Sequence, residues 1–401
     1  MFFKDSRTPS LDDLGANDVH EAWTHYCASH DDACDLSGSN PTAVGLPSID
    51  LPDETLAAAI RTPYRASAQG LALTREAIAN YYADANAHVN PENIQLYAST
   101  SEAIGAILKL LCLPGDEVIT CTPTYPLLDC PTALECVQLI EIPLQDCARE
   151  WSIDFYTLEK TCSPKTRALI VVSPNNPTGH KIRCDEMAHL VEFCAKRDVA
   201  LIVDEVFGSY CFDSNDEQMP EAAAAYFNKP NNGLVISLSG LSKVCGLPQH
   251  KLGWALFGGA PDIVAEAMQR MSFITDSTLS VSGWVQRIAP DLLKQRAKFR
   301  EPCMERMRQN LALLHQFEKK DDTQWYVDHV DGGWSACLRL PARLRDEPLA
   351  ARLSASGVRV FPGAFFGYRE TQPTLVVSLI TPTPVLNAGM TRLCALLQEW
   401  I

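Results

Sequence analysis

The chain has 401 residues, enough for about two domains, with 46% hydrophobic and 21% charged residues. A large core can therefore form, and long disordered segments are not expected. The formal net charge of −15 disfavours a nucleic acid or an anionic membrane as partner, and no apolar run is long enough to span a bilayer. Because the N-terminus lacks the apolar stretch of a signal peptide, we expect a soluble, cytoplasmic protein.

Helical and strand patterns alternate through the first two thirds of the chain. Apolar residues at helical spacing predict amphipathic helices at 74–83, 101–112 and 185–197. Short apolar runs predict buried strands at 117–120, 168–172, 200–203 and 234–237. This alternation predicts an α/β fold whose large domain has a mostly parallel sheet between helices.

The pattern changes after about residue 290. A charged helical stretch at 294–319 is followed by strand-like segments at 332–340, 358–361 and 374–379. We expect a smaller α+β domain built from both ends of the chain. The predicted division is an N-terminal segment (1–48) packed on the small domain, a large domain (49–290) and a small C-terminal domain (291–401).

The fifteen cysteines are scattered, without a C-x-x-C pair or a Cys/His cluster at zinc spacing. We interpret them as reduced thiols that mostly act as small hydrophobic side chains, and we predict no metal site.

Three residues in different motifs suggest a common chemistry. Lys243 follows a Ser-rich turn, Asp204 ends an apolar strand, and Asn176 lies in a loop rich in Pro and Gly. Such a set can hold a pyridine aldehyde: the lysine forms an imine, the aspartate pairs with the ring nitrogen, and the asparagine bonds the phenolic oxygen. Open α/β sheets bind ligands at the carboxyl ends of their strands, where these residues are predicted to lie. The pattern points to pyridoxal 5'-phosphate.

Two weaker signals agree with this hypothesis. Thr100 and Ser101 follow the strand predicted at 94–97 and open a helix, where a phosphate can bind, although small polar residues there are often only helix caps. Tyr125 lies beyond the next strand and could stack on the cofactor ring, although a single loop tyrosine is more often structural. The order of all these groups along the chain is more specific than any one of them.

Taken together, the motifs resemble those of the class I/II aminotransferases, which are fold-type I pyridoxal-phosphate enzymes. The resemblance runs from the Asn40 loop to Ser378. It implies that Lys243 is the Schiff-base lysine and proton carrier, that Asp204 partners the pyridine nitrogen, and that Asn176 and Tyr125 contact the ring. The implied phosphate shell comprises Thr100, Ser101, Ser239 and Lys251. Tyr64 resembles the tyrosine that reaches the phosphate of a neighbouring subunit, which implies a homodimer.

Two positions depart from the family pattern. Phe207 stands where many members have a tyrosine that donates to the phenolic oxygen. Val376 stands where many have an arginine that pairs with the substrate α-carboxylate, for which the guanidinium fork is well suited. Three options remain: a different basic residue, polar and backbone donors, or a substrate without an α-carboxylate. Of these, we favour an α-amino acid held by Asn176 and a relocated arginine. The candidate substrate contacts are Asn40, Asn176, Arg65 and Arg369.

The resemblance favours an aminotransferase that passes an amino group between an amino acid, or an amine, and a 2-oxo acid. A lyase, decarboxylase or oxidase on the same scaffold is an alternative, because one substrate carbanion serves all these reactions. A non-catalytic cofactor-binding regulator is a third possibility. The retained Lys243 and the lack of an appended helix-turn-helix both argue against a non-catalytic regulator.

Overall fold

The fold comes from a computed structural model, which describes residues 7–8, 17–84, 87–147, 149–212, 223–227, 233–319 and 324–400. The side chain of Leu127 is outside this description. Within these ranges, no helix is both long enough and apolar enough to cross a membrane.

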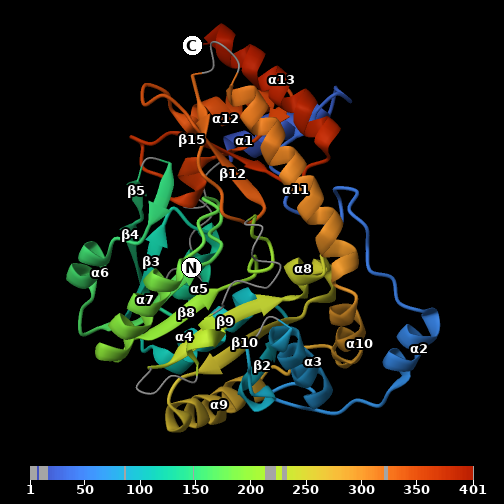
Figure 1. Cartoon of the computed structure of the whole chain (residues 1–401), viewed down its shortest axis with the longest axis vertical. Helices are drawn as coiled ribbons and strands as arrows, with labels where there is room; N and C mark the ends of the chain where they lie inside the picture. Colours follow the sequence, from blue (N-terminus) through green and yellow to red (C-terminus); the bar gives the residue numbers. More distant parts are fainter. Residues whose placement is uncertain are drawn as a thin grey trace, which may run out of the picture.

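A large sheet forms the centre of the molecule (Figure 1). Its seven strands within the described residues lie in the order β2-β10-β9-β8-β7-β3-β4. All neighbours are parallel except for β10, which runs antiparallel to both β2 and β9. The strands are β2 (Ile94–Tyr97), β3 (Glu117–Thr122), β4 (Gln138–Pro143), β7 (Thr166–Val172), β8 (Ala200–Asp204), β9 (Val235–Gly240) and β10 (Gly253–Gly258).

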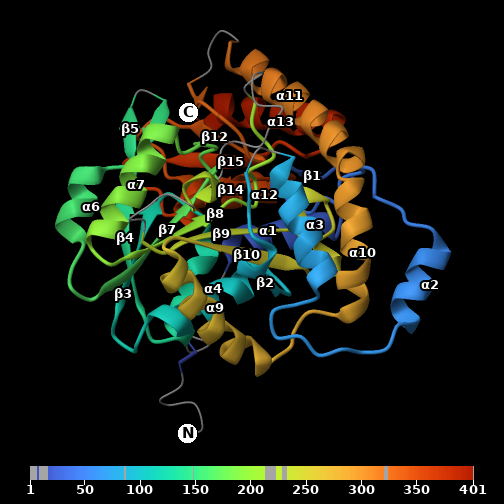
Figure 2. The ribbon, with the colours of Figure 1, turned by 60° about the horizontal axis from the view of Figure 1, so that its bottom comes forward.

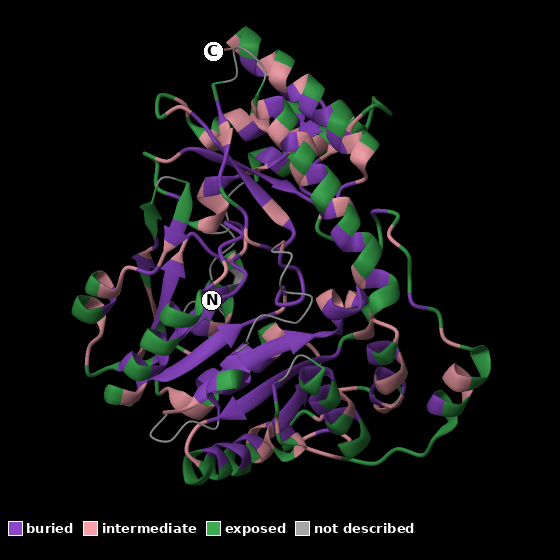
Figure 3. Ribbon diagram, in the orientation of Figure 1, coloured by how far each residue is buried: buried purple, intermediate pink, exposed green. Residues whose placement is uncertain are grey.

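Both faces of this sheet are covered by helices, which explains the continuous apolar runs of its strands. Successive side chains of a strand point to opposite faces. Ile202 accordingly packs in the cluster that includes α4 (Thr100–Leu111) and α9 (Pro261–Asp276), whereas Leu201 packs in the cluster that includes α7 (Cys184–Lys196). Figure 2 shows α4 and α9 together on one side of the sheet, and the central strands are buried throughout in Figure 3.

A smaller antiparallel sheet lies above the large one in Figure 1, in the order β11-β12-β15-β14. The long helix α11 (Ala297–Glu318) leads to it, and α12 (Asp346–Ala355) and α13 (Thr383–Trp400) pack beside it. The N-terminal part joins this region: β1 pairs in parallel with β13, and α1 contacts α12. These elements are α1 (Asp18–Cys27), β1 (Cys34–Asp35), β11 (Tyr326–Val327), β12 (Ser335–Arg339), β13 (Val358–Arg359), β14 (Phe361–Pro362) and β15 (Thr374–Ser378).

The predicted fold class is thus confirmed: a mostly parallel α/β part and a smaller α+β part formed by both ends of the chain. The exact domain boundaries stay predictions. Two predicted elements differ. The strand predicted at 358–361 is divided between β13 and β14, which belong to different sheets, and the charged helix does not start at residue 294. Helix α10 ends at Lys294, and α11 begins only at Ala297. The remaining elements are α2 (Asp53–Arg61), α3 (Ala72–Ala83), α5 (Asp129–Leu134), β5 (Gln145–Cys147), β6 (Glu150–Ser152), α6 (Phe155–Thr161), α8 (Leu241–Val244) and α10 (Gly283–Lys294).

Candidate active site

A cavity of about 530 Å³ lies at the carboxyl ends of the parallel strands, between the two sheets. Its size is typical of small-molecule sites. The described lining includes six residues that the sequence had nominated: Thr100, Ser101, Tyr125, Asn176, Asp204 and Lys243. They come from different strand ends and are up to 143 positions apart in the chain, so the fold brings them to one place.

Lys243 lies in the short helix α8, immediately after β9. Its backbone carbonyl accepts a hydrogen bond of 2.6 Å from the Tyr210 hydroxyl, which fixes the turn. The Nζ atom lies 4.9 Å from the centroid of the Trp334 ring and 5.6 Å from that of Phe207. Burial lowers the pKa of Lys243, and the Asp204 carboxylate opposes part of that change. A lysine with a lowered pKa is a better nucleophile and proton carrier near neutral pH.

Asp204 ends β8 and is buried. The backbone N–H of Val206 donates to its Oδ1 atom at 3.1 Å. Burial raises the pKa of Asp204 to about 6, although that hydrogen bond and Lys243 both lower it. Among the described residues no cation comes within 4.0 Å of its carboxylate. A buried acid without a close counter-ion at a cavity wall suits a ligand that brings its own N–H donor.

Asn176 connects the two parts of the molecule. Its Oδ1 atom accepts a hydrogen bond of 3.2 Å from the Ser335 hydroxyl in β12. This contact orients the side-chain amide, whose Nδ2 group is the donor end.

Tyr125 also lines the cavity. Burial, and to a smaller extent the Asp204 carboxylate, raise the pKa of Tyr125, so its phenol stays protonated at neutral pH.

The start of α4 forms a cradle for an anion. Ser99 caps this twelve-residue helix by accepting a hydrogen bond of 3.1 Å from the Glu102 N–H, and Thr100 and Ser101 follow it. Gly253 of β10 packs closely against this first turn. A Cβ atom at Gly253 would lie 3.0 Å from the Ser99 carbonyl carbon and 3.1 Å from the Thr100 nitrogen. The backbone N–H groups and the positive end of the helix dipole both favour a phosphate at such a position.

The other nominated residues do not line this cavity in the single chain. Tyr64 is 73% exposed, and with Arg65 it borders a separate small hollow. Arg369 is exposed, and Asn40 holds its own turn by accepting a hydrogen bond of 2.7 Å from the Thr42 hydroxyl. Ser239 is buried in β9, and Lys251 adopts a left-handed backbone conformation just before β10.

Sequence reasoning missed the side of the cavity that the small sheet and the N-terminal segment supply. The 361–366 stretch is rich in aromatic residues, a pattern that does not distinguish a cavity wall from an ordinary core. Trp334 packs edge-on against Phe207 with ring centroids 5.5 Å apart, and no sequence pattern singles it out. The lining residues in this group are Asn17, Ser37, Ser39, Trp334, Ser335, Phe361, Phe365, Phe366, Val377 and Ser378.

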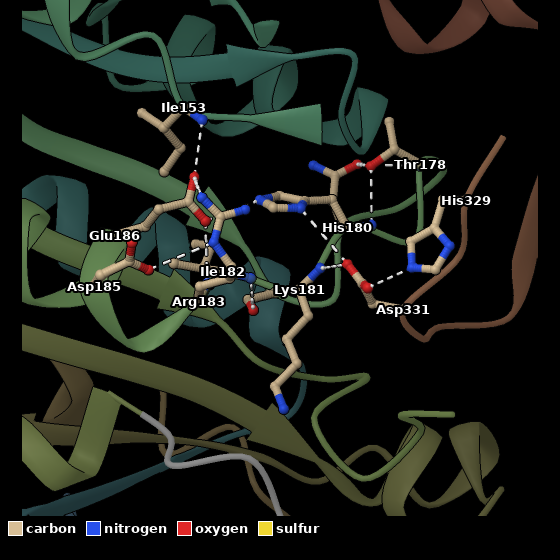
Figure 4. A network of polar contacts seen from close by, with 12 residues as sticks. Ile153, Thr178, His180, Lys181, Ile182, Arg183, Asp185, Glu186, His329 and Asp331 are labelled. Atoms are coloured by element: carbon tan, nitrogen blue, oxygen red, sulfur yellow. Dashed lines mark hydrogen bonds and ion pairs between the residues drawn. The ribbon is translucent and has the colours of Figure 1, made fainter. Parts of the chain in front are cut away.

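A buried histidine stabilises the loop that carries Asn176 (Figure 4). His180 lies between Glu186, at 3.4 Å from Nε2 to Oε2, and Asp331, at 3.7 Å from Nδ1 to Oδ2. Burial lowers the pKa of His180, but the two carboxylates outweigh burial, so the pKa is raised. The backbone N–H of Asp331 also donates to the Gly179 carbonyl at 3.1 Å. The loop is therefore tied to the segment that leads into β12.

Comparison with known proteins agrees with this geometry. Residues 61–383 match the family described as "Aminotransferase class I and II", so the chain belongs to that family. It is 27% identical over 229 residues to the glutamate-pyruvate aminotransferase AlaA of Escherichia coli, which covers 56% of this chain and 54% of that protein. An alanine aminotransferase of Mycobacterium tuberculosis is 24% identical over 249 residues, which covers 61% and 56%. The chain thus spans about half the length of the curated relatives it matches.

Solved structures extend the likeness of fold to nearly the whole chain. A tyrosine aminotransferase from Leishmania infantum superposes with a TM-score of 0.82 at 20% identity, covering 92% of both chains. An aminotransferase from Escherichia coli gives a TM-score of 0.81 at 20% identity, covering 98% of both. At this level of identity, these structures show the fold alone.

Enzymes of this family depend on pyridoxal 5'-phosphate, and three local features fit that cofactor. Lys243 offers an amine with a lowered pKa, Asp204 offers a buried acid without a close counter-ion, and Thr100 and Ser101 place the positive end of the α4 dipole at the cavity wall. All three border the same cavity.

Proposed function

We propose that this protein is a pyridoxal-phosphate-dependent aminotransferase that passes an amino group between an amino acid, or an amine, and a 2-oxo acid. The observation that carries the proposal is the meeting of Lys243 and Asp204 in one cavity, in a chain of this family. The cofactor, when bound, supplies an electron-withdrawing ring that stabilises negative charge on the substrate carbon.

Each nominated residue has a role in this proposal. Lys243 would hold the cofactor covalently, and its amine would move the proton to and from the substrate carbon. Asp204 would pair with the ring nitrogen, and Asn176 would donate to the phenolic oxygen. The stacking contact and the phosphate contacts are assigned to Tyr125, Thr100, Ser101, Ser239 and Lys251.

A donor and acceptor panel tests the proposed reaction. The purified holoenzyme is incubated with candidate amines and amino acids, with and without a 2-oxo acid, and products are identified by mass. An aminotransferase needs the oxo acid for continued turnover and yields a new amino acid from it. Sustained release of carbon dioxide, ammonia or hydrogen peroxide without an oxo acid would instead indicate a decarboxylase, lyase or oxidase. Cofactor binding without any product would indicate the non-catalytic alternative.

Phe207 leads to a spectroscopic prediction. The hydroxyl of Tyr210, three residues further on, is already used by the Lys243 carbonyl, so it does not replace the missing tyrosine. We expect Phe207→Tyr to supply a donor to the phenolic oxygen and so stabilise its anionic form. The pH midpoint of the cofactor's visible absorption should therefore fall, as measured by titration of the holoenzyme. An unchanged or higher midpoint would contradict this assignment, and Phe212→Tyr, outside the cavity lining, is the matched control.

We also propose a homodimer in the cytoplasm. The support for the dimer is Tyr64, which is 73% exposed and lies away from its own chain's cavity, and the support for the location is that cysteines such as Cys27, Cys130 and Cys147 are exposed free thiols. Tyr64→Phe should weaken cofactor binding about tenfold, because one hydrogen bond to a charged group contributes roughly 1.5 kcal/mol, while thermal unfolding of the cofactor-free protein stays unchanged. Titration with cofactor and sedimentation measure these effects, and full activity in a strictly monomeric sample would refute the shared site.

A further inference from the structure

The amine of Lys243 lies against an aromatic part of the cavity wall. Its Nζ atom is 4.9 Å from the centroid of the Trp334 ring and 5.6 Å from that of Phe207. Both rings line the cavity. An aromatic face attracts a cation that lies within roughly 6 Å of the ring centroid, and an indole attracts it more strongly than a phenyl ring does. Trp334 is therefore placed to act on the charged form of this amine.

Trp334 is held firmly in this place. The Gly333 N–H donates to the Tyr210 carbonyl at 2.8 Å, and the Trp334 carbonyl accepts a hydrogen bond of 2.7 Å from the Leu379 N–H. Trp334 is 2% exposed, and its ring meets that of Tyr210 edge to face with centroids 5.2 Å apart. The hydroxyl of the same tyrosine donates to the Lys243 carbonyl at 2.6 Å. Tyr210 thus fixes both the turn of the lysine and the position of the indole.

Few other groups can stabilise a charged amine here. Burial lowers the pKa of Lys243, and Asp204, the one carboxylate among the described lining residues, opposes part of that change. Tyr125 also faces the cavity, but its phenol is neutral at neutral pH. Because Asp204 is proposed to pair with the ring nitrogen of the cofactor, its charge is largely neutralised there in the holoenzyme. The aromatic face then remains as the group that favours the ammonium form of Lys243.

The indole N–H of Trp334 does not account for its position. The Nε1 atom is buried and has no hydrogen-bond partner among the described residues, although a buried indole N–H usually has one. The ring instead meets a polar group, the Lys243 amine, on its face. An experiment that changes only the electron density of this face can therefore separate attraction for the amine from packing.

We infer that Trp334 is a positioning residue for Lys243: its ring face holds the free amine, in the ammonium form, at the cavity wall. The inference rests on the proposed function, in which this amine moves a proton. The amine takes the proton while the electron pair of the broken C–H bond stays with the substrate carbon, and the ammonium later gives the proton up, which restores the amine. Because the ring attracts the ammonium alone, it makes the amine a stronger base in a buried place.

Acetylation of the cofactor-free protein measures this basicity. A trace of acetic anhydride is added at a series of pH values, and peptide mass spectrometry follows Lys243, with Lys109 outside the cavity as internal reference. The pH midpoint of Lys243 labelling should fall by about one unit in Trp334→Leu and by about half a unit in Trp334→Phe, which keeps a weaker ring face. Trp284→Phe, outside the cavity lining, should keep the wild-type midpoint. An unchanged or higher midpoint in Trp334→Leu overturns the inference.

Fluorinated tryptophan tests the ring face without a change of sequence. Fluorine withdraws electron density from the indole face, which weakens its attraction for a cation and leaves the shape of the ring almost the same. All seven tryptophans of the chain are replaced biosynthetically by mono-, di- and trifluorinated analogues. The Lys243 midpoint should fall stepwise with fluorine content in the wild-type sequence and stay constant in Trp334→Phe. A wild-type midpoint that does not follow fluorine content overturns the inference, even if the Trp334 variants do not fold.

Turnover of the holoenzyme shows whether the contact serves the reaction. Trp334→Leu should lower kcat about tenfold, the factor that corresponds to one pKa unit, with a smaller change in KM. A donor deuterated at the reacting carbon should show a larger isotope effect than in the wild type, and Trp334→Phe should recover part of kcat. An effect confined to KM would contradict the positioning role. A holoenzyme that converts no donor refutes the proposed function alone, because labelling without cofactor still decides whether Trp334 holds the amine.

Discussion

Lys243→Ala should lower turnover by about a thousandfold or more, because the substitution removes the group proposed to carry the proton to and from the substrate carbon. It should also abolish covalent attachment of the cofactor. In the wild type, borohydride reduction should fix the cofactor on the peptide that contains Lys243, and peptide mass spectrometry should locate it there. The cavity itself should survive the change, since the turn is held by the backbone carbonyl of residue 243 rather than by its side chain.

Lys109→Ala is the matched control for this experiment. Lys109 is a half-exposed lysine in α4 that pairs with Glu135 outside the cavity, so its replacement should leave labelling and turnover unchanged. Added methylamine should partly restore activity to Lys243→Ala, because a small free amine can occupy the space of the missing side chain and move the proton. Cofactor fixed at another lysine, or an alanine variant with wild-type turnover, would contradict the assignment.

Several residues that the sequence nominated line the large-sheet side of the cavity, for a physical reason. Carboxyl ends of parallel strands meet at one edge of a sheet, so polar residues that follow successive apolar runs converge there. Asp204 ends β8, whereas Asn176 and Lys243 follow β7 and β9, and all three line one cavity. The prediction needed only local patterns and a sheet topology common to such chains.

The small-sheet side could not be predicted in this way. Phe361 and Ser378 are brought to the cavity by antiparallel pairing of β14 and β15, and Trp334 directly precedes β12 of the same sheet. The local patterns of these residues do not distinguish a cavity wall from an ordinary core. Tertiary contacts also determine which charged side chains are paired. Arg339 lies between two leucines in the sequence, yet two carboxylates pair with it in the fold, and the His180 network depends on a partner 151 residues away.

Asp204→Asn should have opposite effects on stability and activity. In the cofactor-free protein, burial raises the pKa of Asp204 to about 6 from an ordinary 3.8. Because the folded-state pKa lies above the unfolded value, the folded protein loses stability as pH rises from about 4 to 6, and the loss persists at higher pH. The cost at pH 8 is about 3 kcal/mol. The amide carries no charge, so the cofactor-free variant should be more stable than the wild type at pH 8, by up to that amount, and the difference should vanish near pH 4.

Activity should fall, because the amide cannot neutralise a protonated ring nitrogen. We expect a decrease on the order of a hundredfold or more, as is usual when a preorganised electrostatic group is removed. The gain in thermal stability on adding cofactor should also be smaller in the variant than in the wild type. Chemical denaturation at pH 4, 6 and 8, with and without cofactor, and steady-state kinetics measure these effects.

Glu205→Gln is the control that separates burial from cofactor contact. Burial raises the pKa of Glu205 to about 7, but its carboxylate accepts hydrogen bonds from the Ser237 hydroxyl and the Ala223 N–H and does not line the cavity. Its replacement should therefore change the pH dependence of stability while the stabilisation by added cofactor stays at the wild-type value. If Asp204→Asn bound cofactor and turned over like the wild type, Asp204 would be only a buried structural acid, and its assignment as the partner of the ring nitrogen would be wrong.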